Sequence, residues 1–64
     1  MMDGDYVLAM QVTVGRRTHE VYWSGTSIVL DVASAQKYLS RQMANSVASR
    51  LVNKKKLLFY PKEI

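Results

Sequence analysis

The sequence predicts an α+β fold, in which a small antiparallel sheet packs on one amphipathic helix in the order β-β-(β)-α-β. Two segments rich in Val, Leu and Thr flank Gly15 and Arg16, a pattern typical of a hairpin. Apolar residues recur at helical spacing after Ser40. A short apolar run then ends at Pro61, which suits a last strand at the edge of a sheet.

The length of the chain allows one small domain. The 64 residues are expected to form a single domain over positions 1–64, with positions 1–5 flexible. A core of this size supplies only about 3–5 kcal/mol. No cysteine is present, so no disulfide supports the fold, and a reducing, cytoplasmic location is expected. Association between copies would bury more apolar surface, so a homo-oligomer is one hypothesis.

The composition favours a globular protein over a disordered or membrane-spanning one. The hydrophobic fraction of 48% is ordinary for a folded domain. The apolar run at positions 6–10 is five residues long, whereas a transmembrane helix needs about 20. We therefore expect no membrane partner.

The predicted hairpin joins residues 6–14 to residues 17–23. Gly15 at the first loop position suits a type II′ turn, because glycine accepts a positive φ. A single register sorts both strands into an apolar face and a polar face, and a slip of one residue would destroy that sorting. The apolar face pairs Val14 with Arg17, Val12 with His19, Met10 with Val21 and Leu8 with Trp23; the polar face pairs Thr13 with Thr18, Gln11 with Glu20 and Ala9 with Tyr22.

The connection to the helix reads as a series of short elements. Residues 24–27 form a turn cluster, and residues 28–30 have the composition of a brief extended segment. Asp31 can cap a short helical turn over residues 32–35. A single helix over residues 32–53 is the competing interpretation, because Ala35 and Leu39 continue the helical spacing.

The main helix is predicted over residues 40–53 with Ser40 as its N-cap. Met43, Val47 and Leu51 are its expected anchors, each contributing about 1.5–3 kcal/mol if fully buried. Ala44 and Ala48 share that side and would let the helix lie close to the sheet. The final strand is predicted over residues 57–60, ending at Pro61.

The charge of the chain is strongly uneven. The net charge is +4, but no acid occurs between positions 32 and 62, where seven cations give a local charge of +7. Such a one-sided field attracts an acidic protein surface or a nucleic acid, although cations that only keep a small protein soluble give the same pattern. The expected contact surface is the polar side of the helix with the residues around its C-terminal end: Lys37, Arg41, Arg50, Lys54, Lys55, Lys56 and Tyr60.

Catalytic chemistry finds little support. His19 is the one histidine, and the hairpin register places it at the loop end of the apolar face, as a partly covered structural residue. Glu20 points to the opposite face of the same strand, so it cannot orient His19. Asp3 and Asp5 are too few oxygen ligands for a hard cation. We expect no catalytic residue, metal or cofactor, and an enzyme only if a partner chain completes a site.

The aromatic residues divide into core and surface. Tyr38 and Phe59 are expected to be buried, and Trp23 to belong to the core rather than anchor a partner. Tyr22 and Tyr60 occupy outward or edge positions, where they could stack on single-stranded bases.

One pattern in the second half of the chain resembles small orphan proteins of bacteriophages and prophages. It consists of Asp31, Ala35, Tyr38, Ser40, Ala44, Val47, Ala48 and Leu51, following an N-terminal strand and an aromatic turn. The resemblance implies a β-β-β-α-β order, with residues 37–39 as a short strand and the helix broken at Ser40. It implies no shared catalytic residues. Those proteins usually carry acids after the helix cap, and this helix has none.

Together these observations predict a non-enzymatic accessory protein, phage-encoded if the resemblance holds, that docks on a macromolecule through a basic helix-side surface. A nucleic-acid-binding protein that contacts the phosphate backbone is one alternative. A self-associating structural or assembly protein is the other.

Overall fold

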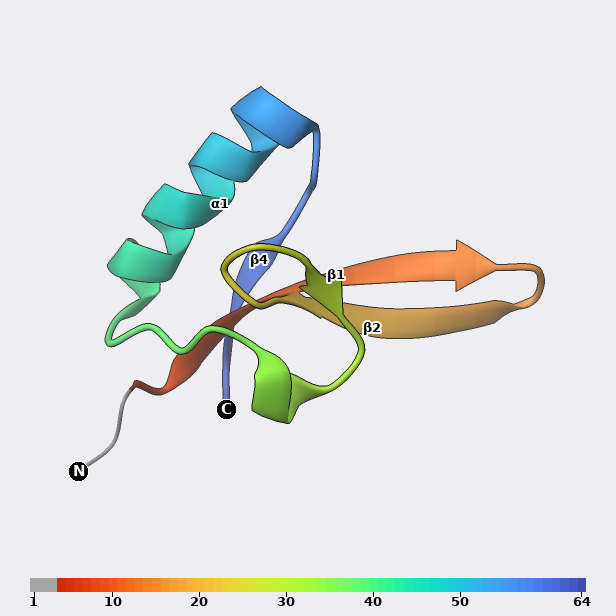
Figure 1. Ribbon diagram of the computed structural model, residues 1–64, viewed down its shortest axis with the longest axis horizontal. Helices are drawn as coiled ribbons and strands as arrows, with labels where there is room; N and C mark the ends of the chain where they lie inside the picture. Colours follow the sequence, from red (N-terminus) through yellow and green to blue (C-terminus); the bar gives the residue numbers. More distant parts are fainter. Residues whose placement is uncertain (1–3) are drawn as a thin grey trace.

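The computed structural model describes residues 4–64 and confirms the α+β class. A four-stranded antiparallel sheet packs against one long helix (Figure 1). The elements follow in the order β1 (Tyr6–Val14), β2 (Arg17–Trp23), β3 (Ile28–Val29), the 3-10 turn η1 (Val32–Ser34), α1 (Arg41–Lys55) and β4 (Tyr60–Glu63).

The strand order across the sheet is β3-β2-β1-β4. The predicted hairpin register is confirmed from the Ala9–Tyr22 pair to the Val14–Arg17 pair. Gly15 has a φ of 63°, and Lys56 is the one non-glycine residue with a positive φ within residues 4–64. Arg16 therefore keeps a negative φ, as the predicted type II′ turn requires.

The core lies between one face of the sheet and α1. Leu8, Trp23 and Phe59 reach it from the sheet side, and Trp23 meets Phe59 at a ring-centroid distance of 5.8 Å with the planes tilted by 56°. Tyr38 is also buried there, as expected. These large side chains fill the space above the helix residues Ala44, Ala48 and Leu51, which are all buried.

The expected anchoring of the helix is partly wrong. Leu51 is buried, but Met43 is 49% exposed and Val47 only half-buried. Ala44, fully buried, and Ala48 face the sheet, as predicted. Small residues at the contact let the helix approach closely, and the aromatic residues of the sheet side supply the volume.

The two ends of α1 have well-defined caps. The Ser40 hydroxyl accepts a hydrogen bond from the Met43 amide at 3.2 Å, which confirms the predicted N-cap. The helix extends two residues beyond the predicted end, to Lys55. Lys56 then adopts the left-handed conformation, and the amides of Lys56 and Leu57 donate to the carbonyls of Val52 and Leu51. This pairing is the Schellman arrangement that ends many helices.

The connection from β2 to α1 is broken into pieces, so the single helix over residues 32–53 does not form. Asp31 caps η1 by accepting from the Ala33 amide at 3.0 Å, as predicted. The third strand is β3, and of the residues 37–39 only Tyr38 makes a bridge, to Tyr6. The chain is extended at Ala35 and Ser40, which interrupts any helix between them.

The final strand lies three residues later than predicted. Pro61 falls within β4 and pairs with Leu8, instead of ending the strand. This position tolerates a proline because β4 is an edge strand, so one side of it needs no amide donor.

The first residues of the chain were expected to be flexible over positions 1–5, and this expectation falls partly outside the described range. Within that range, Gly4 lies against the backbone of Tyr38, and the Asp5 carbonyl accepts a hydrogen bond from the Ile64 amide at 2.8 Å.

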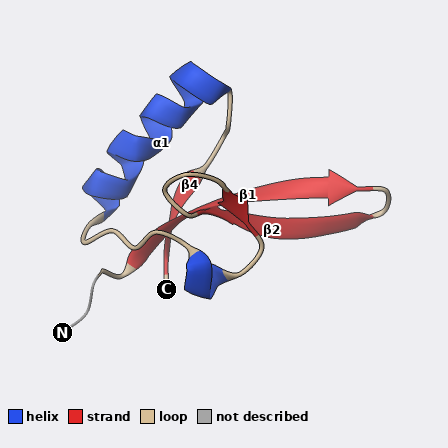
Figure 2. Cartoon of the chain, in the orientation of Figure 1, coloured by secondary structure: helices blue, strands red, loops and turns tan. Residues whose placement is uncertain are grey.

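The outer half of the hairpin projects beyond the core, and we call residues 12–19 the arm. Figure 2 shows its two strands extending away from α1. Val12 is half-buried, but Val14 is 68% exposed and His19 is exposed, so the expected burial of these two residues is wrong. The alternation defines the face correctly, but no helix reaches this far to cover it.

Within residues 4–64, no helix is long and apolar enough to cross a membrane.

Candidate binding surfaces

The structure brings four of the predicted site residues together at the C-terminal end of α1. Arg50 precedes Lys54 by one helical turn on the same side, and Lys55 and Lys56 follow directly. All four side chains are exposed. Cations at this end also complement the negative pole of the helix dipole. We call these four residues the basic cluster: Arg50, Lys54, Lys55 and Lys56.

Arg41 lies away from the basic cluster, at the first residue of α1. It lies nine positions before Arg50, or about 14 Å away along the helix axis. Its guanidinium stands 5.7 Å from the centre of the Tyr6 ring, a cation–π contact. Together with Gln42, Asn45 and Pro61 it lines an open pocket of about 560 Å³ between the helix and β4. Arg41 therefore belongs to a separate surface.

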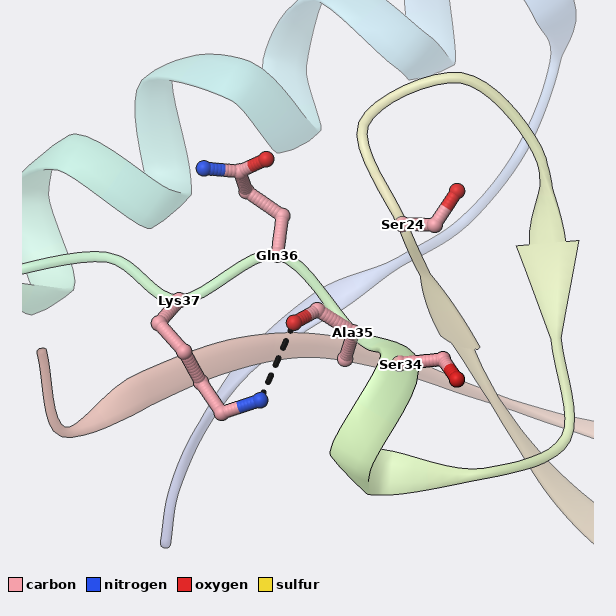
Figure 3. Close-up of a pocket in the computed structure, with 5 residues that line it drawn as sticks. All are labelled: Ser24, Ser34, Ala35, Gln36 and Lys37. Atoms are coloured by element: carbon pink, nitrogen blue, oxygen red, sulfur yellow. Dashed lines mark hydrogen bonds between the residues drawn. The ribbon is translucent and has the colours of Figure 1, made fainter. Parts of the chain in front are cut away.

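Lys37 is used to hold the chain after η1. Its ammonium donates to the carbonyls of Val32 and Ala35, each at 3.0 Å. Figure 3 shows this side chain folded back beside Ala35, while Gln36 points the other way. Ser24, Ser34, Ala35, Gln36 and Lys37 line an open polar pocket of about 420 Å³. Its one cation already has two carbonyl partners, so it is poorly placed to recognise an anion.

Tyr60 belongs to a polar group on the face of the sheet opposite α1. Directly paired residues share a face, and Ala9 pairs with both Tyr22 and Tyr60. The Glu20 carboxylate accepts hydrogen bonds from the Tyr22 hydroxyl at 2.7 Å, the Tyr60 hydroxyl at 3.1 Å and the Lys62 ammonium at 2.5 Å. These contacts connect β2 to β4 across the central strand. We call this group the Glu20 network.

The Glu20 network changes the ionisation of its members. The hydrogen bond from Lys62, followed by that from Tyr22, lowers the pKa of Glu20 below its ordinary value. The bond to Glu20 correspondingly raises the pKa of Lys62 and that of Tyr22. The shifts of Glu20 and Lys62 favour their ion pair, and that of Tyr22 favours the protonated hydroxyl that donates to Glu20. Lys62 is thus matched by an acid and does not add to the field of the basic cluster.

Glu20→Gln is expected to lower the stability of the fold at neutral pH and to flatten its acid dependence. Because the pKa of Glu20 is lowered on folding, its contribution is present at neutral pH and is lost as the pH falls through that lowered value. The loss of the wild-type contribution begins near the ordinary glutamate pKa of about 4.3. Urea denaturation followed across this range measures both effects.

Glu63→Gln provides the matched control, since it removes one carboxylate from the exposed end of β4. The control is expected to keep the wild-type acid dependence. If Glu20→Gln retained it as well, the hydrogen bonds of Glu20 would contribute nothing to folding.

The residue types that catalysis or metal binding would use are dispersed among residues 4–64. His19 is exposed on the arm, away from both pockets. No group of three metal-ligating side chains occurs among residues 4–64, and Asp3 lies outside the described residues. The serines near the polar pocket bond one another and the backbone, with the Ser24 hydroxyl donating to the Ser27 carbonyl at 3.0 Å.

The contact surface predicted from the sequence does not include two cations, Arg16 and Arg17. Both are exposed at the tip of the arm. The predicted contact surface lies within the acid-free stretch after Asp31, which does not include these two residues. A pair of arginines placed at a predicted hairpin loop was the signal that could have found them.

Comparison with protein families, with curated proteins and with solved structures finds no match to this chain.

Proposed function

We propose that this chain is a non-enzymatic binding protein that docks on an acidic macromolecule through the basic cluster. One observation carries the proposal. Four exposed cations gather at one end of α1, and the helix contains no acid. Lys37 and Lys62, which donate hydrogen bonds within the protein, and Arg41, which contacts the Tyr6 ring, lie elsewhere.

The electrostatics of the basic cluster support docking on an extended negative surface. Like charges one helical turn apart, such as Arg50 and Lys54, repel one another, which offsets part of the favourable interaction of cations with this end of the helix. An acidic partner relieves that repulsion when it binds. Lysine and arginine side chains that contact phosphates or carboxylates do so with charge-assisted hydrogen bonds. The non-enzymatic part rests on the exposed position of His19, the one histidine, and on the lack of cysteine.

The test is a titration of three labelled probes: a short duplex DNA, a single-stranded RNA and polyglutamate. We expect binding to at least one of them at about 50 mM salt, with affinity falling as salt rises. Arg50→Ala with Lys54→Ala should weaken that binding. For a nucleic-acid probe it should also reduce the slope of log K against log salt by about 2.

Ser49→Ala with Asn53→Ala is the matched control, because these exposed residues lie on the same helical turns and carry no charge. It should bind as the wild type does. Failure to bind any of the three probes would overturn the proposal, as would equal affinity of the cluster variant and the control.

A further inference from the structure

The arm is a two-stranded ribbon without cover on either face near its tip. Three residue pairs, Val12–His19, Thr13–Thr18 and Val14–Arg17, lead to the Gly15–Arg16 turn. Thr13, Val14 and every residue from the turn to His19 are exposed. At about 3.4 Å per residue, the arm extends about 10 Å from its base to the turn. The hairpin runs along the long axis of the molecule, which measures 39 Å (Figure 1).

The arm carries positive charges at its tip, together with two hydroxyl groups and one exposed apolar side chain. Arg16 and Arg17 give it two positive charges, and residues 12–19 contain no acid. The hydroxyls of Thr13 and Thr18 lie 3.2 Å apart on one face. Val14, on the other face, adds an exposed apolar group.

The nearest acid to the arm is Glu20, at its base, and its charge is neutralised. Its carboxylate is held by the Lys62 ammonium and by two tyrosine hydroxyls. The arm therefore presents a positive tip with no opposing field from its own strand. This combination of shape and charge fits a negatively charged groove that is wide enough for a two-stranded ribbon.

We propose that the arm enters the major groove of B-form duplex DNA while the basic cluster contacts phosphates, an inference that rests on the proposed function and assigns its acidic partner. The major groove is about 12 Å wide and 8.5 Å deep and admits a two-stranded ribbon. An arm about 10 Å long, whose strands lie about 4.8 Å apart, is long enough to reach the floor of that groove and narrow enough to enter it. Arginine reads guanine O6 and N7 there, and apolar groups contact the thymine methyl.

Two separate cationic elements favour DNA over an acidic protein. The basic cluster lies on α1, and Arg16 and Arg17 lie at the end of the hairpin that points away from it (Figure 1). Duplex DNA carries charge uniformly along its length, so it satisfies both elements at once. An RNA duplex cannot take the arm in this way, because its major groove is too deep and narrow for side chains to read.

The experiment compares the wild type, Arg16→Ala with Arg17→Ala, and Arg50→Ala with Lys54→Ala on a short labelled DNA duplex and on the RNA duplex of the same sequence. Dimethyl sulfate protection at guanine N7 reports occupancy of the major groove. The wild type should prefer the DNA duplex and protect N7. The arm variant should lose the protection and on the order of tenfold in affinity, whereas the cluster variant should retain protection at saturating protein. Circular dichroism confirms that each variant is folded.

The outcomes separate this inference from the proposed function. Protection that persists in the arm variant, or equal affinity for the DNA and RNA duplexes, would overturn groove entry. Binding to polyglutamate without binding to DNA would overturn groove entry while leaving docking on an acidic partner in place. Binding to none of these probes would overturn both.

Discussion

Ala44→Asp is expected to leave the chain unfolded at room temperature and neutral pH. Ala44 is fully buried on the second turn of α1, within the cluster that contains Leu8 and Phe59. An unpaired carboxylate in such a place costs several kcal/mol, and the whole core supplies only about 3–5 kcal/mol. Far-UV circular dichroism should show loss of the helical signal, and the cooperative thermal transition should disappear.

Asn45→Asp is the matched control because it adds the same charge one residue further along, on an exposed side chain. Its expected effect on the free energy of unfolding is within about 0.5 kcal/mol. Similar stability of the two variants would mean that α1 does not face the sheet through its alanines.

Gly4→Ala is expected to destabilise the fold by at least about 2 kcal/mol. Gly4 has a φ of 143°, which residues with a side chain rarely adopt. A Cβ at this position would also overlap the backbone carbonyl of Tyr38. Relief of that overlap would disturb the neighbouring bridge, in which the amides of Tyr6 and Tyr38 donate to each other's carbonyls at 3.2 and 2.8 Å. Thermal unfolding measures the change.

Gly15→Ala separates backbone strain from steric overlap. Gly15 also has a positive φ, but a Cβ there meets open space. Its expected cost is the left-handed penalty alone, about 1–2 kcal/mol. If Gly4→Ala cost no more than Gly15→Ala, the packing of Gly4 against Tyr38 would not contribute to stability.

Local signals predicted the parts of the fold that depend on neighbouring residues. Gly15 and the alternation of the flanking strands determine the hairpin register, because a slip would exchange its two faces. Ser40 marks the start of α1 because its hydroxyl satisfies an otherwise unpaired amide. Both features were therefore predictable without any tertiary contact.

The extent of burial was not predictable in the same way. Alternation shows which face of a strand is apolar, but it does not show how far the covering element reaches. Val14 and Leu8 share a face, yet one is exposed and the other fully buried. The helical period likewise placed Met43 and Ala44 on one side of α1, and only the volume of Trp23 and Phe59 decides that the alanine faces inward.

The candidate binding surface was predictable in its charge but not in its grouping. A count of cations cannot show which of them already have partners. Lys37 binds carbonyls two and five residues away, and Lys62 binds Glu20, which lies 42 residues earlier in the chain. The Tyr60 hydroxyl donates to the same carboxylate, on the face of the sheet opposite α1. These contacts divide the predicted surface and leave the basic cluster as its coherent part.

Lys56 belongs both to the C-terminal cap of α1 and to the basic cluster. It holds a φ of 59° at the position where the Schellman arrangement usually has glycine. A lysine in this conformation costs about 1–2 kcal/mol relative to an unstrained backbone, a large fraction of what a small core supplies. The basic cluster thus includes one cation, Lys56, at a position where glycine would make the fold more stable. Glycine here would favour the stability of the fold, whereas lysine adds a positive charge to the surface that the proposed function uses.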